Sequence, residues 1–135
     1  MEVAPQESKP LRVMVVDDNR DAADSSTDML RLLGHEAQCA YGGLDGVQMA
    51  ERYQPDAVLL DLSMPGIDGF ETLRLLREVP GMRHAFVVAV TGYGAQEDTR
   101  RTREAGFDAH LTKPAPLDSL IEVLDRASAR PVAGR

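Results

Sequence analysis

The sequence lacks several features that would place it in other classes of protein. One cysteine, Cys39, occurs among its 135 residues, so no disulfide can form within the chain, and a reducing compartment such as the cytoplasm is expected. We expect this cysteine to be a buried structural thiol. No apolar run approaches the roughly 20 residues that a membrane-spanning helix needs, which predicts that the chain does not insert into a membrane.

Basic residues are too scattered along the chain for a nucleic-acid-binding face. The formal net charge is −7, and lysine and arginine form no run long enough for a basic face. Because proteins hold nucleic acids mainly through a concentrated basic face, we expect no direct nucleic-acid binding. Apolar residues make up 43% of the chain and charged residues 27%, which is the balance of an ordinary globular domain.

Short apolar runs alternate with segments of helical periodicity along residues 11–127, which we expect to form one domain. The runs predict β-strands at residues 11–16, 36–40, 56–60, 85–90 and 108–111. The segments of helical pattern are residues 20–33, 44–53, 70–78, 96–105 and 116–127. Strands that alternate with helices through short connections predict an α/β fold, with helices on both faces of a parallel sheet.

The two ends of the chain differ in composition from this domain. Residues 1–10 are polar, with two prolines and no apolar run, so we expect a disordered leader that is not a signal peptide. Residues 128–135 continue past the last segment of helical pattern, and from Pro131 onward we expect a frayed tail.

Polar side chains mark the points where the expected strands end. Asp17 and Asp18 follow the first strand, Asp61 the third, Thr91 the fourth and Lys113 the fifth. Binding sites in open parallel sheets form beyond the carboxyl ends of the strands. We therefore expect three carboxylates, one hydroxyl and one ammonium group to meet at one edge of the sheet.

Three carboxylates in one pocket repel one another. Two unit charges ~4 Å apart interact by about 4 kcal/mol at an effective dielectric constant near 20, so the acids would not all stay ionised without a cation. Mg²⁺, or Mn²⁺ in its place, prefers the oxygen ligands that such a cluster offers. A carboxylate beside this cation can attack a phosphoryl group and form an aspartyl phosphate.

Four sequence motifs carry a resemblance to a known family. They are VVDDN at residues 15–19, LLDLSMPGIDGF at 59–70, AVTGYG at 89–94 and LTKPA at 111–115. The chain resembles the response-regulator receiver domains of two-component signalling. The resemblance implies a flavodoxin-like (βα)5 three-layer sandwich whose five-stranded parallel sheet has the order 2-1-3-4-5. The segments TGYG and DAHLTKP are most similar to receivers of hybrid histidine kinases or to single-domain receivers of phosphorelays.

The resemblance also implies a role for each acid at the strand ends. Asp61 would be the phosphoacceptor, and its donor would be a phosphohistidine on a sensor histidine kinase or a histidine phosphotransfer protein. Asp17 and Asp18 would hold Mg²⁺ together with Asp61, and Ser63 would contribute its backbone carbonyl. A domain of this kind is a signalling module, and slow hydrolysis of its own aspartyl phosphate would be its only turnover.

The remaining positions concern the phosphoryl group and the partners. Thr91 and Lys113 would bind the phosphoryl oxygens, and the peptide bond before Pro114 would be cis. The position three before Lys113, usually Tyr or Phe in receivers that switch by rotating an aromatic ring, is His110, so the coupling to the output is built differently or this histidine is an ordinary surface residue. The candidate contacts with the phosphodonor lie in the first helix and are Asn19, Ala22, Ala23 and Ser26.

Two other functions fit part of this pattern. Haloacid-dehalogenase-like phosphatases also form an aspartyl phosphate, but they place an acid two residues after the nucleophile, where this chain has Ser63. Steady hydrolysis of a phosphate ester would favour that class. Degenerate receivers that only bind partners lack acceptor or metal residues, whereas this chain has every expected one. Failure of Mg²⁺-dependent labelling would favour a binding module.

Overall fold

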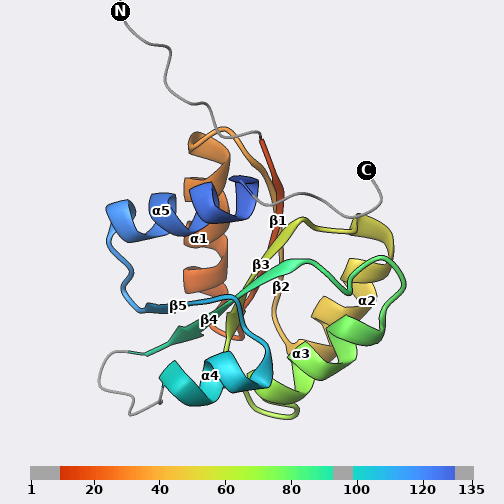
Figure 1. The fold of residues 1–135 in the computed structure, drawn as a ribbon. Helices are drawn as coiled ribbons and strands as arrows, with labels where there is room; N and C mark the ends of the chain where they lie inside the picture. The colour runs from red at the N-terminus through yellow and green to blue at the C-terminus, as the bar shows by residue number, and fades with distance from the viewer. Residues whose placement is uncertain (1–9, 93–98, 130–135) are drawn as a thin grey trace, which may run out of the picture.

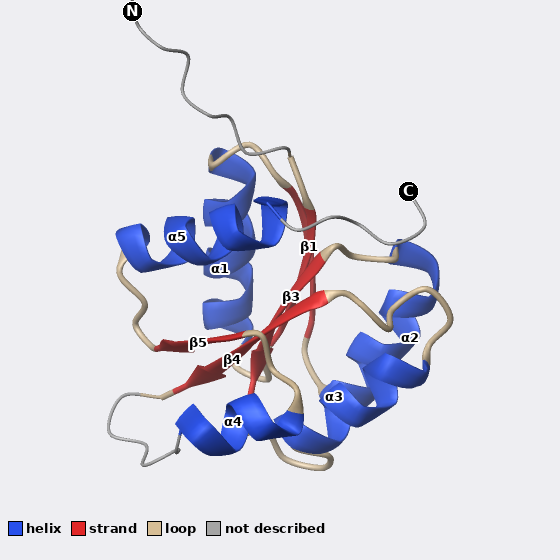
Figure 2. Cartoon of the chain, in the orientation of Figure 1, coloured by secondary structure: helices blue, strands red, loops and turns tan. Residues whose placement is uncertain are grey.

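Five parallel strands form the centre of the structure, a computed structural model that describes residues 10–92 and 99–129. The strands are β1 (Arg12–Val16), β2 (Glu36–Ala40), β3 (Ala57–Asp61), β4 (Phe86–Thr91) and β5 (Ala109–Thr112). Their order across the sheet is β2-β1-β3-β4-β5, and every neighbouring pair is parallel. Figure 2 shows the strands in red between the helices. The structure thereby confirms the flavodoxin-like fold that the resemblance implied.

Helices cover both faces of this sheet. They are α1 (Arg20–Leu32), α2 (Gly43–Tyr53), α3 (Gly69–Glu78), α4 (Thr99–Ala105) and α5 (Leu117–Ala129). Figure 1 shows α1 and α5 together on one face, and α2, α3 and α4 on the other. The sheet order explains this division, because right-handed crossovers that first run toward β2 and then toward β5 place their helices on opposite faces. None of the described helices has the length and apolar character to cross a membrane.

Each strand contributes side chains to two separate cores. In β1, Val13 and Val15 pack beneath α1 and α5, whereas Met14 and Val16 pack beneath α2 and α3. This alternation follows from the two-residue period of a strand. A strand buried on both faces must be apolar at successive positions, which explains why the central strands appear in the sequence as continuous apolar runs.

Two side-chain caps begin the helices that follow β1 and β3. Asn19 caps α1 by accepting a hydrogen bond from the backbone N–H of Ala22 at 3.0 Å, and Asp68 caps α3 in the same way through the N–H of Glu71 at 3.0 Å. Each cap satisfies a backbone donor that the helix leaves unpaired. The caps therefore fix where the chain turns back from the carboxyl edge of the sheet.

The predicted element bounds differ from the structure mainly at the ends of elements. Strand β3 extends to Asp61, which pairs with Val90 of β4, whereas the apolar pattern predicted an end one residue earlier. Helix α5 continues to Ala129, two residues beyond the prediction, because the helix still buries Ala127 in its last turn. The predicted start of α4 at residues 96–98, most of the leader 1–10 and the tail 130–135 lie outside the described residues.

Cys39 is less buried than the sequence predicted. It lies on β2, at the edge of the sheet, and is half-buried beside α1. Its thiol Sγ lies 3.5 Å from Oδ1 of Asp24, which also accepts a hydrogen bond from the Tyr41 hydroxyl at 2.6 Å. The prediction of a fully buried thiol was wrong, because an edge strand has a neighbouring strand on one side only.

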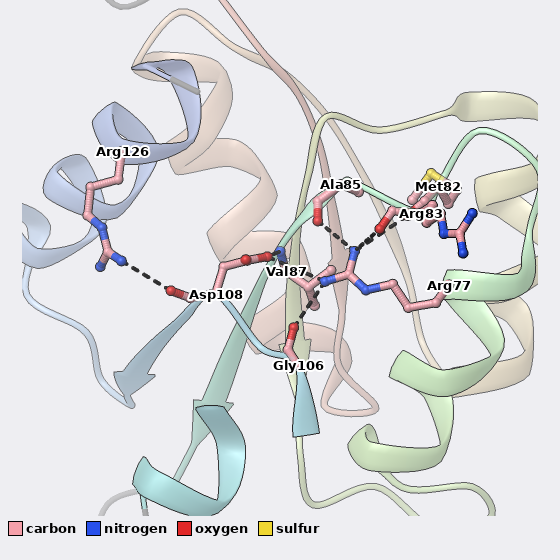
Figure 3. Close-up of polar contacts among 8 residues, drawn as sticks. All are labelled: Arg77, Met82, Arg83, Ala85, Val87, Gly106, Asp108 and Arg126. Atoms are coloured by element: carbon pink, nitrogen blue, oxygen red, sulfur yellow. Dashed lines mark hydrogen bonds and ion pairs between the residues drawn. The ribbon is translucent and has the colours of Figure 1, made fainter. Parts of the chain in front are cut away.

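A single arginine joins three segments at the amino-terminal edge of the sheet. Figure 3 shows the guanidinium of Arg77 among backbone carbonyls, with hydrogen bonds of 2.7 Å to the oxygen of Ala85 and 3.1 Å to that of Gly106. It also pairs with the Asp108 carboxylate at 3.4 Å, which accepts the backbone N–H of Val87 at 2.9 Å. These contacts tie the end of α3 to the loops that lead into β4 and β5.

We expect Arg77→Ala to lower the free energy of unfolding by about 2–4 kcal/mol, because it leaves several backbone carbonyls and a carboxylate without their charged donor. Arg74→Ala is the matched control, since Arg74 forms exposed ion pairs with Glu71 and Glu78 on the same helix. Such pairs contribute about 1 kcal/mol or less. Urea unfolding of both variants measures the difference, and equal losses would contradict this account.

Candidate functional site

Three carboxylates meet at the carboxyl edge of the sheet. Asp17 directly follows β1, Asp18 is the next residue, and Asp61 is the last residue of β3, the strand beside β1. One oxygen from each carboxylate lies within 4.8 Å of the others. Asp17 and Asp61 are each only 5% exposed, whereas Asp18 is exposed. The structure therefore brings together the three acids that the sequence singled out, and it buries two of them.

The ammonium group of Lys113 lies within this acidic cluster. Its Nζ donates to Oδ2 of Asp17 at 2.6 Å and lies 3.6 Å from Oδ2 of Asp61. The backbone N–H of Lys113 also donates to the carbonyl of Thr91 at 2.7 Å, which anchors the end of β5 against β4. The peptide bond between Lys113 and Pro114 is cis, as the resemblance implied.

Backbone amides hold the two buried carboxylates in place. Oδ1 of Asp17 accepts the N–H of Asn19 at 2.9 Å, and Oδ1 of Asp61 accepts the N–H of Ser63 at 3.0 Å. Behind Asp61, the start of α3 packs so closely that a Cβ on Gly69 would lie 2.8 Å from the Asp61 carbonyl oxygen. A side chain at Gly69 would therefore push the acceptor loop away from its present position.

Burial is the main influence on the titration of Asp61. It raises the pKa of this carboxyl from 3.8 to about 6, and the neighbouring charge of Asp17 acts in the same direction. The hydrogen bond from Ser63 and the charge of Lys113 oppose the rise. Burial would lower the pKa of Lys113, but its contacts with Asp17 and Asp61 outweigh burial and leave that pKa raised. One ammonium thus compensates the acidic cluster only in part.

The donor set of this cluster fits a hard divalent cation. The ligand atoms available are carboxylate oxygens of Asp17, Asp18 and Asp61, and no histidine or cysteine belongs to the group. Mg²⁺ takes oxygen ligands and usually keeps several waters, for which the exposed side of Asp18 leaves access. The excess negative charge beside Lys113 would favour such an ion.

Thr91 ends β4 beside this cluster and is 4% exposed. Its hydroxyl oxygen Oγ1 lies 3.0 Å from Nε2 of His110, in a hydrogen bond between β4 and β5. Within residues 10–92 and 99–129, this is the hydrogen bond that the Thr91 hydroxyl makes. Thr91 is thus placed at the site, but its hydroxyl bonds to β5 and not to the acidic residues.

A cavity of about 590 Å³ opens beside the acids, between α1 and the segment that joins β5 to α5. Asp17, Asp61 and Lys113 form its charged part, and the rest of its lining is mostly apolar. Two of the expected donor contacts, Ala22 and Ser26, line this cavity.

The structure corrects one of the two other expected donor contacts. Ala23 is fully buried against the sheet, so it cannot contact a donor protein as predicted. Asn19 is exposed and caps α1. The sequence analysis missed Met29 and Ala115, which line the cavity. The period of α1 could have indicated Met29, since it lies seven residues after Ala22.

Comparison with known proteins decides the family. The family model described as the response regulator receiver domain matches residues 13–125. The chain belongs to the response regulator receiver domain family. Receiver domains are signalling modules, so this membership favours a phosphoacceptor signalling function over a haloacid-dehalogenase-like phosphatase or a binding-only module.

Individual relatives agree with this assignment along most of their length. The polar-differentiation response regulator DivK of Brucella anthropi is 30% identical over 115 residues, which are 85% of this chain and 94% of DivK. The crystal structure of the receiver domain of the sensor histidine kinase PA1611 from Pseudomonas aeruginosa, with a magnesium ion coordinated in the active site cleft, is 29% identical, with a TM-score of 0.79. That alignment covers 90% of this chain and 100% of the other.

A third similar protein is also a response regulator. A response regulator of Chloroflexus aurantiacus, solved by crystallography, is 29% identical with a TM-score of 0.82, and the alignment covers 90% of this receiver domain and 100% of that protein. The similar proteins thus include a curated response regulator and the receiver part of a kinase. Both kinds of receiver were expected from the segments around β4 and β5.

We expect Asp61→Asn to raise the free energy of unfolding at pH 7.5 without Mg²⁺ by about 1–3 kcal/mol, since each pKa unit corresponds to about 1.4 kcal/mol. An acid whose folded-state pKa is raised from 3.8 to about 6 destabilises the fold fully above pH 6. That cost disappears as the pH falls toward 4, where the carboxyl is protonated in both states. Urea unfolding at several pH values measures the gap between variant and wild type, and a gap that does not narrow with falling pH would contradict this cause.

Proposed function

We propose that this receiver domain accepts a phosphoryl group from a phosphohistidine onto Asp61, in a Mg²⁺-dependent reaction, and thereby changes its affinity for partners in a phosphorelay. The observation that carries the proposal is the position of Asp61. Its carboxylate is buried, is held by the Ser63 amide and lies 3.6 Å from the ammonium of Lys113. A nucleophile and a cation for the transferred group are thus adjacent in one pocket.

The reaction needs an ionised Asp61. One carboxylate oxygen attacks phosphorus, a P–O bond forms, and the P–N bond to the donor imidazole breaks, so the imidazole nitrogen leaves with the electron pair. The pKa of about 6 keeps most of Asp61 ionised near neutral pH. Negative charge spreads over the phosphoryl oxygens during the transfer, and Lys113 and the Thr91 hydroxyl are the groups of this chain that would bind those oxygens.

The residues that would hold the cation are Asp17, Asp18, Asp61 and the backbone carbonyl of Ser63. When bound, Mg²⁺, or Mn²⁺ in its place, neutralises charge on the carboxylates and on the phosphoryl oxygens. Lys113 donates to Asp17 without the metal, and a second positive charge at the cluster would weaken that attraction. The ammonium is then available to the phosphoryl group.

The residue two positions after the acceptor argues for a stored phosphoryl group over rapid turnover. Ser63 occupies the position at which a phosphatase of the haloacid dehalogenase type needs an acid, and its amide donates to Asp61. Without a positioned acid or base, hydrolysis of the acyl phosphate would be slow. We therefore infer a signalling domain that can dephosphorylate itself slowly.

The cavity between α1 and the β5–α5 segment is our candidate for the docking of the phosphodonor. It reaches Asp61 itself and opens between Ser26 of α1 and Ala115. Met29 adds a long apolar side chain that is 38% exposed. A helix that carries the donor histidine could lie along α1 and place its phosphoryl group over Asp61.

The source of the phosphoryl group would be a sensor histidine kinase or a histidine phosphotransfer protein in the cytoplasm. The similarity to DivK and to the PA1611 receiver supports this pairing. The net charge of −7 gives no support for direct nucleic-acid binding. We further propose that residues 11–127 form the functional unit, between a leader of residues 1–10 and a tail of residues 128–135 whose first two residues complete α5.

Incubation with acetyl phosphate and Mg²⁺ should add one phosphoryl group to the wild-type chain, as measured by intact mass. We expect Asp61→Ala to show no adduct, because the nucleophile is gone, and hydroxylamine to remove the wild-type adduct, because acyl phosphates react with it. Chelation of the metal should prevent labelling. Glu51→Ala is the matched control, since Glu51 is an exposed acid at the far end of α2.

An adduct that survives in Asp61→Ala would place the acceptor elsewhere. No adduct from acetyl phosphate or from a phosphorylated histidine kinase would favour a module that only binds partners. Steady release of phosphate from a simple ester would instead favour a phosphatase.

The docking site predicts a variant that separates two kinds of donor. Ser26→Arg should slow transfer from a phosphorylated histidine phosphotransfer protein by at least about tenfold, because a bulky cation at the cavity mouth removes interface contacts that are together worth about 1.4 kcal/mol or more. Acetyl phosphate is small enough to enter past it, so that labelling rate should stay near wild type. Gln48→Arg is the matched control, because Gln48 is an exposed residue of α2, on the opposite face of the sheet. Equal rates of protein-to-protein transfer in all three chains would rule out this docking face.

A further inference from the structure

The hydrogen bond between Thr91 and His110 connects the phosphoryl site to the edge strand β5. Oγ1 of Thr91 and Nε2 of His110 are 3.0 Å apart, and Thr91 is 4% exposed, so water has little access to compete for this hydroxyl. His110 is half-buried. The Thr91 hydroxyl that our proposed function assigns to a phosphoryl oxygen is therefore already bonded to a different strand.

We propose that His110 is a positioning residue that restrains phosphorylation, because it accepts the proton of the Thr91 hydroxyl and holds that hydroxyl away from the phosphoryl site. The proposal rests on the proposed function of Asp61. A hydroxyl has one proton to donate. If Thr91 donates it to the imidazole, the same proton cannot stabilise a phosphoryl oxygen, and the threonine must exchange one acceptor for the other.

The backbone around Thr91 confines this exchange to the side chain. Thr91 pairs with Thr112 in the β4–β5 ladder, and its carbonyl accepts the N–H of Lys113 at 2.7 Å. These bonds hold the backbone of Thr91 against β5. The hydroxyl can therefore change partner through its side chain alone, by a change of χ1 rotamer or by rotation of the O–H bond. The two partners therefore define two alternative states of Thr91.

The exchange would also carry a signal to the surface. When Thr91 turns to the phosphoryl group, Nε2 of His110 loses its hydrogen bond to Thr91. His110 lies on β5, which has a neighbouring strand on one side only. A released imidazole there would offer a polar group to a partner protein next to α4 and α5, which flank β5 in Figure 1. The hydrogen bond would then be an element with two arrangements, and phosphorylation would bias which one is populated.

His110→Phe tests the restraint, because phenylalanine keeps a planar ring and removes the acceptor nitrogen. We expect labelling by acetyl phosphate and Mg²⁺ to be about two- to tenfold faster than in wild type, the range that the net value of one hydrogen bond allows. His110→Ala removes the same bond without a bulky ring and should change the rate in the same direction. His84→Phe, at an exposed histidine before β4, is the matched control and should leave the rate unchanged.

A double-mutant comparison shows whether the effect passes through Thr91. Thr91→Val replaces the hydroxyl with a methyl group of similar size, and in that background His110→Phe should have no further effect on the rate. The imidazole ¹⁵N resonances of His110 in the metal-free wild type provide a readout that does not depend on the reaction. Nε2 should have the shift of an unprotonated, hydrogen-bonded nitrogen and should lose it in Thr91→Val.

The outcomes separate this proposal from the function on which it rests. If no chain is labelled on Asp61, the proposed function fails, and the restraint fails with it. If the wild type is labelled but both His110 variants label at the wild-type rate or more slowly, the restraint alone is wrong. Slower labelling together with a protonated Nε2 would show the opposite arrangement, in which His110 donates to Thr91 and supports its bond to the phosphoryl group.

Discussion

Repulsion among the carboxylates of Asp17, Asp18 and Asp61 is the constraint around which the carboxyl edge of the sheet is organised. Burial of two of these acids raises the cost of their charge, and the pKa of about 6 at Asp61 expresses that cost. Lys113 and the amides of Asn19 and Ser63 offset part of it. The compensation is incomplete, and an incompletely compensated acidic pocket favours the arrival of a cation.

The rest of the fold can support such a costly site because the two edges of the sheet have different tasks. At the amino-terminal edge, Arg77 joins the segments that lead into β4 and β5 through carbonyls and the Asp108 carboxylate. At the carboxyl edge, Asp61 ends β3, Thr91 ends β4 and Lys113 follows β5. Strand β4 is buried along most of its length and connects the two edges. Stability is concentrated at one edge, and chemistry at the other.

Membership of the receiver family accounts for the acids and the lysine of this site. His110 departs from the family pattern and distinguishes this chain. The acids and Lys113 agree with the motifs that carry the resemblance. His110 does not, and its nitrogen bonds to the hydroxyl that the family pattern assigns to the phosphoryl group. The imidazole of His110 couples β4 to β5 through its hydrogen bond to Thr91. A phenylalanine ring at this position could couple the two strands only through packing. The chemistry that we propose for Asp61 would therefore act on the output surface by a different contact.

The sequence by itself determined the α/β fold class and the membership of the acidic cluster, because both follow from local patterns, whereas the strand order came from the family resemblance. Continuous apolar runs such as residues 57–60 require a strand buried on both faces, and a polar residue at the end of such a run must lie at the edge of the sheet. Tertiary structure decided what no local pattern records. It buried Ala23 and left Cys39 half-exposed, since burial depends on which neighbour covers a face. It also opened the cavity beside α1 and paired Thr91 with His110, because residues distant in sequence become partners only when the strands that carry them lie side by side.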